Sequence, residues 1–366
     1  MNINITCPVS GLGYGVVSKN ILLNLHSLGH RISWWPIGNT EVTSQEEATI
    51  LQEMINNQGL FDYKAPSLRI FHQFSLAQHI GRGLQIGFPI FELNKFTDIE
   101  KQHLRSQERI FVPSKWAENT VNDNIGITND VYVVPFAVDT SIFNDKIPKH
   151  EREDGITVFL NVGKWELRKG HDVLCEAFNK AFEKHDNVRL VMNCFNPCLP
   201  TEEKVRHYNY EWIKMYKTSK LAEKIDVVEG RLPSQKHVAN LMVEADCGVF
   251  PARAEGWNLD LSEMMAMGKP VITTNYSAHT EYCNKDNAKL INPTSLSSAY
   301  DGQWFFGQGE WMDFNDEQMD ELIEHMRCVH REKQSGVLKK NEAGVRTFSE
   351  DFTWKKTAEK ISEYLY

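Results

Sequence analysis

The sequence predicts an α/β fold built from two doubly wound parallel sheets. Three observations carry this prediction: a length of 366 residues, a globular composition with 41% hydrophobic and 24% charged residues, and short apolar runs that alternate with longer periodic ones. A chain of this length suits two domains. Alternating strand and helix patterns are typical of parallel sheets that are covered by helices on both faces.

The first half of the chain predicts one such sheet. Apolar, β-branched runs indicate buried strands at 3–7, 31–35, 68–73, 85–91, 109–114 and 131–136. Periodic segments between them indicate helices at 15–28, 46–56, 97–108 and 115–123. The polar stretch 144–155 contains Pro and Gly and is the best linker candidate, so the first domain is predicted at residues 1–150.

The pattern restarts after the linker candidate and predicts a second domain at residues 151–345. Strands are expected at 156–163, 188–194, 225–230, 247–252 and 270–275. Helices are expected near 170–184 and 234–245, and a further helix lies between the last two strands. The tail, 346–366, reads as an amphipathic helix that carries Phe352 and Trp354.

Charge and cysteine content exclude several classes of protein. A net charge of −9 argues against a broad nucleic-acid surface, although it leaves room for a local basic cleft. The basic run 204–220 favours a solvated helical face. The seven cysteines are scattered, and "CFNPC" at 194–198 lacks a second ligand pair, so reduced thiols, no metal site and a cytoplasmic location are expected. The sequence contains no apolar run of about 20 residues, so no membrane span is expected. Its N-terminus has no basic start, so no secretory signal is expected.

Ligands of open parallel sheets bind at the carboxyl ends of the strands, and two glycine-containing loops lie there. The first carries Gly11, Gly13 and Gly15, which could bring backbone N–H groups close to an anion. Its spacing is not the dinucleotide fingerprint, which argues against NAD, and a plain tight turn is the alternative. The second loop, 163–170, combines glycines with three cations that suit a diphosphate, or it is a solvated basic loop. Its cations are Lys164, Arg168 and Lys169.

The stretch "AEGWNLDLSEMMAMGKPVI" at 254–272 places one carboxylate before a helix and another within it. Asn258 suits the helix cap and Asp260 suits its first turn. Glu263 has apolar neighbours, so it is expected to be partly buried and therefore paired. A sugar diol offers two donors to one such carboxylate, whereas a structural salt bridge is the alternative.

These residues carry a resemblance to a known family. "EGWNLDLSEMMAMGKPVITTNYSAHTEY" resembles the Glu-seven-residues-Glu signature of the family-4 retaining glycosyltransferases of the GT-B fold (glycosyl transferases group 1), with some similarity to bacteriophage members. "NVGKWELRKGHDVLCEAF", "RIFVPSKWAENTV", "VYVVPFAVDTSIF" and "FTWKKTAEKI" resemble further family motifs in the same order. The resemblance spans nearly the whole chain, and it implies two facing Rossmann-like domains, an interdomain cleft and a C-terminal helix that crosses back to the first domain.

The resemblance also implies roles for the motif residues. Lys164 and Lys169 would neutralise a donor diphosphate, Glu255 would face the transferred sugar, and Glu263 would bind the ribose hydroxyls. His72 falls where many members have a histidine near donor and acceptor; a core histidine is the alternative. Trp257 replaces the family's common Phe, and Lys164 replaces its common Arg, which removes the bidentate fork. Other residues expected at the donor are Gly256, Asn258, Leu259, Arg168, Gly13 and Gly15.

The implied function is retaining transfer of a sugar from a UDP- or GDP-linked donor to a hydroxyl acceptor. No cofactor or metal is expected, because the chain has no Asp-x-Asp and cationic side chains can take the metal's place. A soluble glycan or small molecule is the default acceptor, and hydroxymethylated phage DNA is the alternative. A 2-epimerase, a phosphorylase and a non-catalytic sugar-nucleotide binder remain rivals. The aromatic residues Trp34, Trp35, Phe71 and Phe74 could stack on a sugar or a base, or pack the core.

Overall fold

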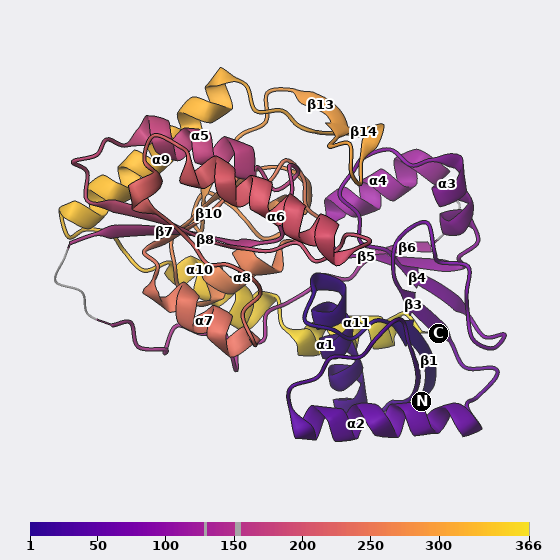
Figure 1. Ribbon diagram of the computed structural model, residues 1–366. Helices are drawn as coiled ribbons and strands as arrows, with labels where there is room; N and C mark the ends of the chain where they lie inside the picture. Colours follow the sequence, from indigo (N-terminus) through magenta and orange to yellow (C-terminus); the bar gives the residue numbers. More distant parts are fainter. Residues whose placement is uncertain (128–129, 151–154, 366) are drawn as a thin grey trace. The chain divides into compact units, whose positions relative to one another are not determined.

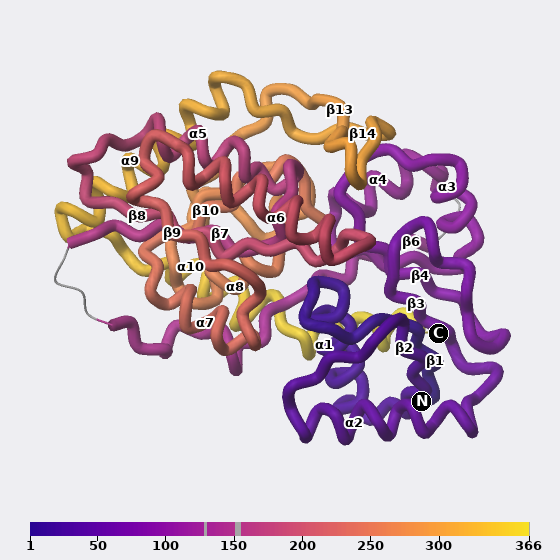
Figure 2. The backbone as a smooth tube through the Cα atoms, in the orientation of Figure 1, coloured from indigo at the N-terminus to yellow at the C-terminus, as the bar shows by residue number. Residues whose placement is uncertain are grey.

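The computed structural model describes residues 1–127, 130–150 and 155–365 and divides the chain into two compact units. Unit 1 comprises Met1–Asp139 and Glu350–Tyr366, and unit 2 comprises Thr140–Ser349. The C-terminal segment therefore belongs to the N-terminal unit, and Figure 2 marks both chain ends there. The boundary expected at 150–151 borders residues 151–154, which lie outside the described residues.

Unit 1 contains a parallel six-stranded sheet in the order β2-β1-β3-β4-β5-β6 (Figure 1). Its strands are β1 Asn2–Cys7, β2 Arg31–Pro36, β3 Ser67–Ile70, β4 Gln85–Phe88, β5 Arg109–Val112 and β6 Asp130–Val133. Its helices are α1 Gly13–Ser27, α2 Gln45–Asn56, η1 Asn57–Leu60, α3 Asp98–Arg105, α4 Lys115–Ile125 and α11 Trp354–Glu363. The last of these, α11, packs against α1.

Unit 2 repeats this architecture with the order β12-β11-β10-β7-β8-β9, again parallel throughout. Its strands are β7 Thr157–Gly163, β8 Val188–Cys194, β9 Ile225–Val227, β10 Cys247–Phe250, β11 Val271–Thr274 and β12 Lys289–Ile291. Its helices are α5 His171–Ala181, α6 Glu202–Lys217, η2 Ala222–Lys224, α7 Gln235–Glu244, α8 Leu259–Ala266, η3 Ser277–Glu281, α9 Asp316–Gln334 and α10 Glu342–Arg346. Figure 1 shows α5 and α9 over one face of this sheet and α7, α8 and α10 over the other.

The sequence explains these elements locally. Both sheets are covered on two faces, so consecutive strand residues are buried, as in β1, where Ile3, Ile5 and Cys7 are fully buried and Asn4 is 1% exposed. Pro89 and Pro113 directly follow β4 and β5 and have no N–H to donate, so these strands end before the predicted 91 and 114. Side-chain oxygens cap several helices, among them those of Ser44, Thr97, Ser114, Thr201 and Thr353.

Two segments differ from the prediction. The tail is not one helix: a π-helical turn, Thr347–Asp351, precedes α11, whose first turn is capped by Thr353. The linker candidate is not free over its described part, because Asp145 pairs with Lys340 at 2.6 Å and Lys149 pairs with Asp246 at 2.5 Å. Residues 144–150 are therefore part of unit 2 and not a free linker.

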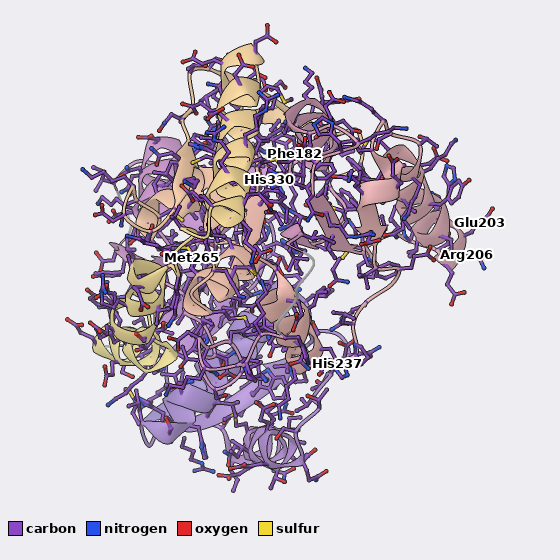
Figure 3. The ribbon with its side chains drawn as sticks, turned by 90° about the vertical axis from the view of Figure 1, so that its left-hand side faces the viewer. Phe182, Glu203, Arg206, His237, Met265 and His330 are labelled. Atoms are coloured by element: carbon purple, nitrogen blue, oxygen red, sulfur yellow. The ribbon has the colours of Figure 1, made fainter. Side chains whose placement is uncertain are left out.

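Unit 2 also contains elements that the sequence reading did not predict. The antiparallel hairpin β13 Leu296–Tyr300 and β14 Phe306–Met312 forms a sheet of its own. Helix α9 is fixed to the sheet by His330, whose ring contacts Phe182 edge-on at 5.5 Å and whose Nδ1 lies 2.8 Å from Thr157 Oγ1 (Figure 3). Arg206 of α6 is exposed, which confirms a solvated face for the run 204–220 at this position, and Glu203, directly before the run, is exposed as well.

Candidate active site

Two loops of unit 2 meet beyond the carboxyl ends of the paired strands β7 and β10. Residues 164–170 connect β7 to α5, and residues 251–258 connect β10 to α8. Gly170 adopts a left-handed conformation with φ +70°, and a β-carbon there would lie 2.0 Å from the carbonyl oxygen of Pro251. Only glycine therefore allows the two loops to approach this closely.

Five charged side chains from these loops form what we call the charged cradle: Lys164, Glu166, Arg168, Lys169 and Glu255. Their charges alternate along a chain of contacts. Glu166 accepts from Lys164 Nζ at 2.9 Å and from Arg168 Nη2 at 2.6 Å. Glu255 lies 2.8 Å from both Arg168 Nη1 and Lys169 Nζ. The Lys164 and Lys169 side chains are 36% and 12% exposed, against 4% for Arg168, so the two lysines are the accessible cations.

A further ion pair holds the two loops together. Arg253 donates from both terminal nitrogens to the two carboxylate oxygens of Asp172, each at 2.8 Å. Its backbone N–H also donates to the carbonyl of Arg168 at 2.7 Å. Bidentate pairing of this kind fixes geometry as well as adding attraction. The cradle is consequently organised before any ligand arrives.

The cradle keeps its carboxylates ionised. Burial opposes ionisation of Glu166, but the charges of Arg168, Lys164 and Lys169 outweigh it and lower the pKa of Glu166 to about 2. The pKa of Glu255 is lowered further, because Arg168 and Lys169 outweigh its burial in the same way. Burial would lower the pKa of Lys169, yet Glu255 and Asp260 hold that pKa above its usual value, so Lys169 is a cation at neutral pH.

Two buried histidines stay neutral beside the cradle and support its loops. His171 is fully buried; its Nε2 lies 3.1 Å from Asn161 Oδ1 and its Nδ1 accepts from the backbone N–H of Glu166 at 3.1 Å. His279 is also fully buried, with Nδ1 3.1 Å from the Thr274 carbonyl and Nε2 3.0 Å from Asn258 Nδ2. Burial lowers the pKa of His171 to about 3 and that of His279 to about 4.

We expect stability to fall as the pH is lowered, in two windows. Between the ordinary value of 6.5 and about 3 or 4, the unfolded chain binds protons that buried His171 and His279 do not. Between 4.5 and about 2, the unfolded chain protonates a carboxylate that remains ionised in folded Glu166. Both differences make stability rise with pH. Thermal unfolding from pH 8 to pH 4 checks this, and a melting temperature that stays constant down to pH 4.5 would contradict it.

Helix α8 begins at a strained residue that the sequence identified as its cap. Asn258 has φ 78° and ψ 79°, and its Oδ1 accepts from the backbone N–H of Leu261 at 3.3 Å. Its Nδ2 donates to His279 Nε2, which is free to accept because Nδ1 faces a carbonyl. The tyrosine hydroxyl of Tyr282 donates to the carbonyl of Trp257 at 2.6 Å. The turn before α8 is therefore held on several sides.

Replacing Asn258 separates the cap from the backbone strain. Asn258→Ala loses the cap and the bond to His279 and leaves a β-carbon in the left-handed region, so we expect a loss of about 2 kcal/mol or more in unfolding free energy. Asn258→Gly loses the same side chain without that strain and should cost less. Urea unfolding of both variants checks this, and equal costs would show that the backbone conformation contributes nothing.

The structure places Glu255 and Glu263, the two glutamates of the stretch 254–272, in the same unit. Glu255 is 5% exposed, its N–H donates to Ser277 Oγ at 2.8 Å, and its carbonyl accepts from the N–H of Ala278 at 3.2 Å. Glu263 lies inside α8 and is 7% exposed, which confirms the expected burial. Gly256 and Leu259 lie in the turn and at the first helical position between them. Asp260, in the first turn, has its pKa raised to about 6, because burial and the charge of Glu255 outweigh the pull of Lys169.

The site residues predicted for the first domain lie in unit 1. Helix α1 starts at Gly13, and a β-carbon at Gly15 would lie 2.1 Å from the backbone nitrogen of Ser10, so Gly15 is required for a tight turn. His72 follows β3 and lies among aromatic rings, with Tyr14 at 4.7 Å and Phe74 at 4.9 Å between centroids. Trp34 is a core residue, fully buried, with its Nε1 donating to the carbonyl of Cys7.

Sequence reasoning missed several residues on which the cradle depends. Glu166 lies within the predicted cationic loop. Its position among three cations was the pattern that could have indicated its role as their counter-charge. Arg253 and Asp172 are separated by 81 positions, and nothing local indicates their pairing. His279 lies in "NYSAHTEY", where nothing local indicates its contact with Asn258. Within the described ranges, no group of three or more His, Cys, Asp or Glu side chains could hold a metal ion. None of the helices described there is long and apolar enough to cross a membrane.

Comparison with known proteins agrees with this geometry. Residues 156–301, which contain the whole cradle and α8, match the family model of the glycosyl transferases group 1. These residues form a group 1 glycosyltransferase domain. The chain is 22% identical over 352 residues to a protein of Sulfolobus islandicus filamentous virus named "Putative glycosyltransferase 45", with 92% of this chain and 87% of the relative covered.

Solved structures confirm the fold over nearly the whole chain. Sucrose-phosphate synthase from Thermosynechococcus elongatus superimposes with a TM-score of 0.69 at 13% identity, covering 99% of this chain and 97% of that one. HepE from Anabaena, solved in complex with UDP-glucose, gives a TM-score of 0.64 at 13% identity, covering 100% of this chain and 99% of that one. The family model confirms the predicted resemblance and the transferase class for residues 156–301. These structures confirm the two-domain Rossmann-like fold.

Proposed function

We propose that this glycosyltransferase moves a sugar, with retention of configuration, from a UDP- or GDP-linked donor to a hydroxyl acceptor without a metal ion. The observation that supports this most is the pairing of Lys169 with Glu255 at 2.8 Å beside the start of α8. It places a partly exposed cation, a buried carboxylate and the backbone N–H groups of a helix start on adjoining segments. Each of these groups suits a different part of a sugar diphosphate.

The residues divide the work by charge. Lys169 and Lys164 would bind the diphosphate and stabilise the negative charge that grows on it as the bond to the sugar breaks. Glu255 would accept hydrogen bonds from the sugar hydroxyls, and Glu263 would accept them from the ribose diol. Arg168 is held by Glu166, Glu255 and the carbonyl of Ala254, so it acts as a positioning residue for Glu255.

The leaving group explains why no strong acid is needed. A nucleoside diphosphate leaves as a stabilised anion, unlike the alkoxide that a glycoside hydrolase must protonate between two carboxylates. Positive charge therefore contributes more than a proton donor would. In the front-face course implied by the family resemblance, a diphosphate oxygen takes the proton of the acceptor hydroxyl as the new bond forms. HepE, a structural neighbour, was solved with UDP-glucose, which supports a UDP-linked donor.

A second candidate acceptor is hydroxymethylated DNA, and the viral origin of one relative supports keeping it. It would require a base to be turned out of the duplex into the enzyme. The net charge of −9 counts against it, because nucleic-acid binding depends on neutralising phosphates. A soluble glycan or small molecule therefore remains the first proposal.

Nucleotide release from a panel of nucleotide sugars tests the proposal in three arms: no acceptor, simple glycans, and DNA containing 5-hydroxymethylcytosine. We expect release that depends on one acceptor, disappears in Glu263→Ala and persists in the exposed control Glu203→Ala. Release only with modified DNA would move the proposal to DNA modification. Interconversion of the donor without acceptor would indicate an epimerase, and stabilisation by a nucleotide sugar without any turnover would indicate a binding protein.

A further inference from the structure

Unit 1 carries a cluster of rings in contact with one another that the proposed donor site does not use, here called the aromatic platform: Tyr14, Phe71, His72 and Phe74. The rings of His72 and Phe74 are parallel, with an interplanar angle of 7° and centroids 4.9 Å apart. Tyr14 and Phe71 contact His72 edge-on at 4.7 and 4.8 Å. Phe74 is 50% exposed, so its ring is presented to solvent on a layer of other rings.

Hydrogen bonds fix the platform and the loop that carries Phe74. The hydroxyl of Tyr14 donates to the carbonyl of Ile90 at 2.6 Å and accepts from the Ile90 N–H at 3.2 Å. Gln73, between His72 and Phe74, donates to Glu100 at 2.8 Å. Buried Arg69 donates to the carbonyl and the hydroxyl of Ser75, which closes the loop that carries Phe74. A ring held in this way loses little freedom when a ligand stacks on it.

Its position and charge indicate which ligand suits it. The platform lies beyond the carboxyl ends of β1 and β3, the edge at which parallel sheets bind ligands. Two charges adjoin the rings: the guanidinium of Arg69 lies 5.7 Å from the centroid of the Phe71 ring, and Glu92 is close enough to Tyr14 to raise the pKa of its hydroxyl beyond the effect of burial. Arg69 is 4% exposed and donates to Ser75 and Gln78, whereas the carboxylate of Glu41 accepts from the N–H of Gly11 at 3.2 Å. Carboxylates repel a phosphate chain but accept hydrogen bonds from sugar hydroxyls.

We propose that the aromatic platform binds a neutral saccharide ring of the acceptor, with Phe74 stacked on the apolar face of the sugar. This inference rests on the proposed function, because it names the acceptor class of that reaction. Phe74 would stack on the sugar, and His72 would support the Phe74 ring by stacking beneath it. Neither role depends on the protonation state of His72. A base of DNA could stack on the same ring, but the flanking carboxylates disfavour the phosphates attached to it.

Binding in the absence of donor tests the proposal on the full chain. Maltotriose, cellotriose and mannotriose are titrated by ligand-observed NMR, together with a short single strand containing 5-hydroxymethylcytosine. We expect at least one trisaccharide to bind, Phe74→Ala to weaken it by about tenfold, and Phe74→Trp to retain it. Tyr63→Ala is the matched control, because Tyr63 is another exposed ring of unit 1, at 49% against 50% for Phe74.

The same samples separate this inference from the proposed function. UDP and GDP are titrated into each variant, since the cradle belongs to unit 2 and Phe74 to unit 1. No binding of any trisaccharide while UDP or GDP still binds would overturn the platform alone. Equal trisaccharide binding by the wild type and Phe74→Ala, or binding of the DNA strand that is lost in Phe74→Ala, would overturn it as well. Failure of both nucleotides in the wild type would count against the donor site instead.

Discussion

Glu255→Gln is expected to lower kcat/KM by about 10²-fold or more and to reduce the free energy of unfolding by about 3 kcal/mol. The stability loss follows from burial. Glu255 is 5% exposed and lies 2.8 Å from both Arg168 and Lys169, so the neutral amide removes this counter-charge from partly buried Lys169 and leaves buried Arg168 with Glu166. Steady-state kinetics and urea unfolding at pH 7 measure the two effects.

A second variant separates the loss of activity from the loss of stability. In Arg168→Met with Glu255→Met, both charges of one buried pair are replaced by apolar side chains, which usually costs far less than breaking the pair. Stability should recover in part while activity stays low, because the carboxylate proposed to bind the sugar is still absent. Glu203→Gln is the surface control, since Glu203 is exposed on α6. Full activity in folded Glu255→Gln would remove Glu255 from the site.

Local patterns predicted the architecture because they arise from local causes. Alternating apolar runs and periodic helices follow from burial on both faces of each sheet, and residues such as Ile3 and Ile5 are fully buried as expected. The hairpin β13–β14 was not predicted, because its second strand, "FGQGEWM", contains two glycines, which weaken a strand pattern. Helix α9 could have been found, since Met319, Leu322 and Met326 are buried at one-face spacing.

The residues of the candidate site could be predicted where a single motif contains several charged residues. Contacts between residues that are far apart in the sequence could not be predicted in this way. Lys169 and Glu255 were both predicted as site residues. Their contact with each other was not, because they are 86 positions apart in the sequence and only the tertiary structure brings them together. The role of Glu166 as counter-charge to Lys164 and Arg168 appears only once the loop is folded. The conformation of Asn258 likewise depends on His279, which approaches it from a different segment. Sequence therefore indicates which groups are present, and the fold decides which of them neutralise each other.

Lys169→Met is expected to lower kcat by about 10²–10³-fold, with a smaller change in the affinity for UDP or GDP. Lys169 is a cation held by Glu255, and its side chain is 12% exposed, so a ligand oxygen can reach it in a site with little competing water. A charge in such surroundings stabilises the leaving diphosphate more as negative charge accumulates on it. The substitution should leave the fold intact, because Glu255 keeps its contact with Arg168 at 2.8 Å.

Two matched lysines show whether this effect belongs to the position or only to the charge. Lys164→Met removes a more exposed cation, 36% against 12%, and should reduce kcat less. Lys220→Met removes a surface cation that pairs with Glu183 and should leave the kinetics unchanged. Single-turnover rates and nucleotide affinities are measured for all three variants. If Lys169→Met weakens nucleotide binding and kcat/KM equally but leaves kcat intact, Lys169 binds the diphosphate in ground state and transition state alike, and the assistance to bond breaking must come from the amino end of α8 or from Lys164.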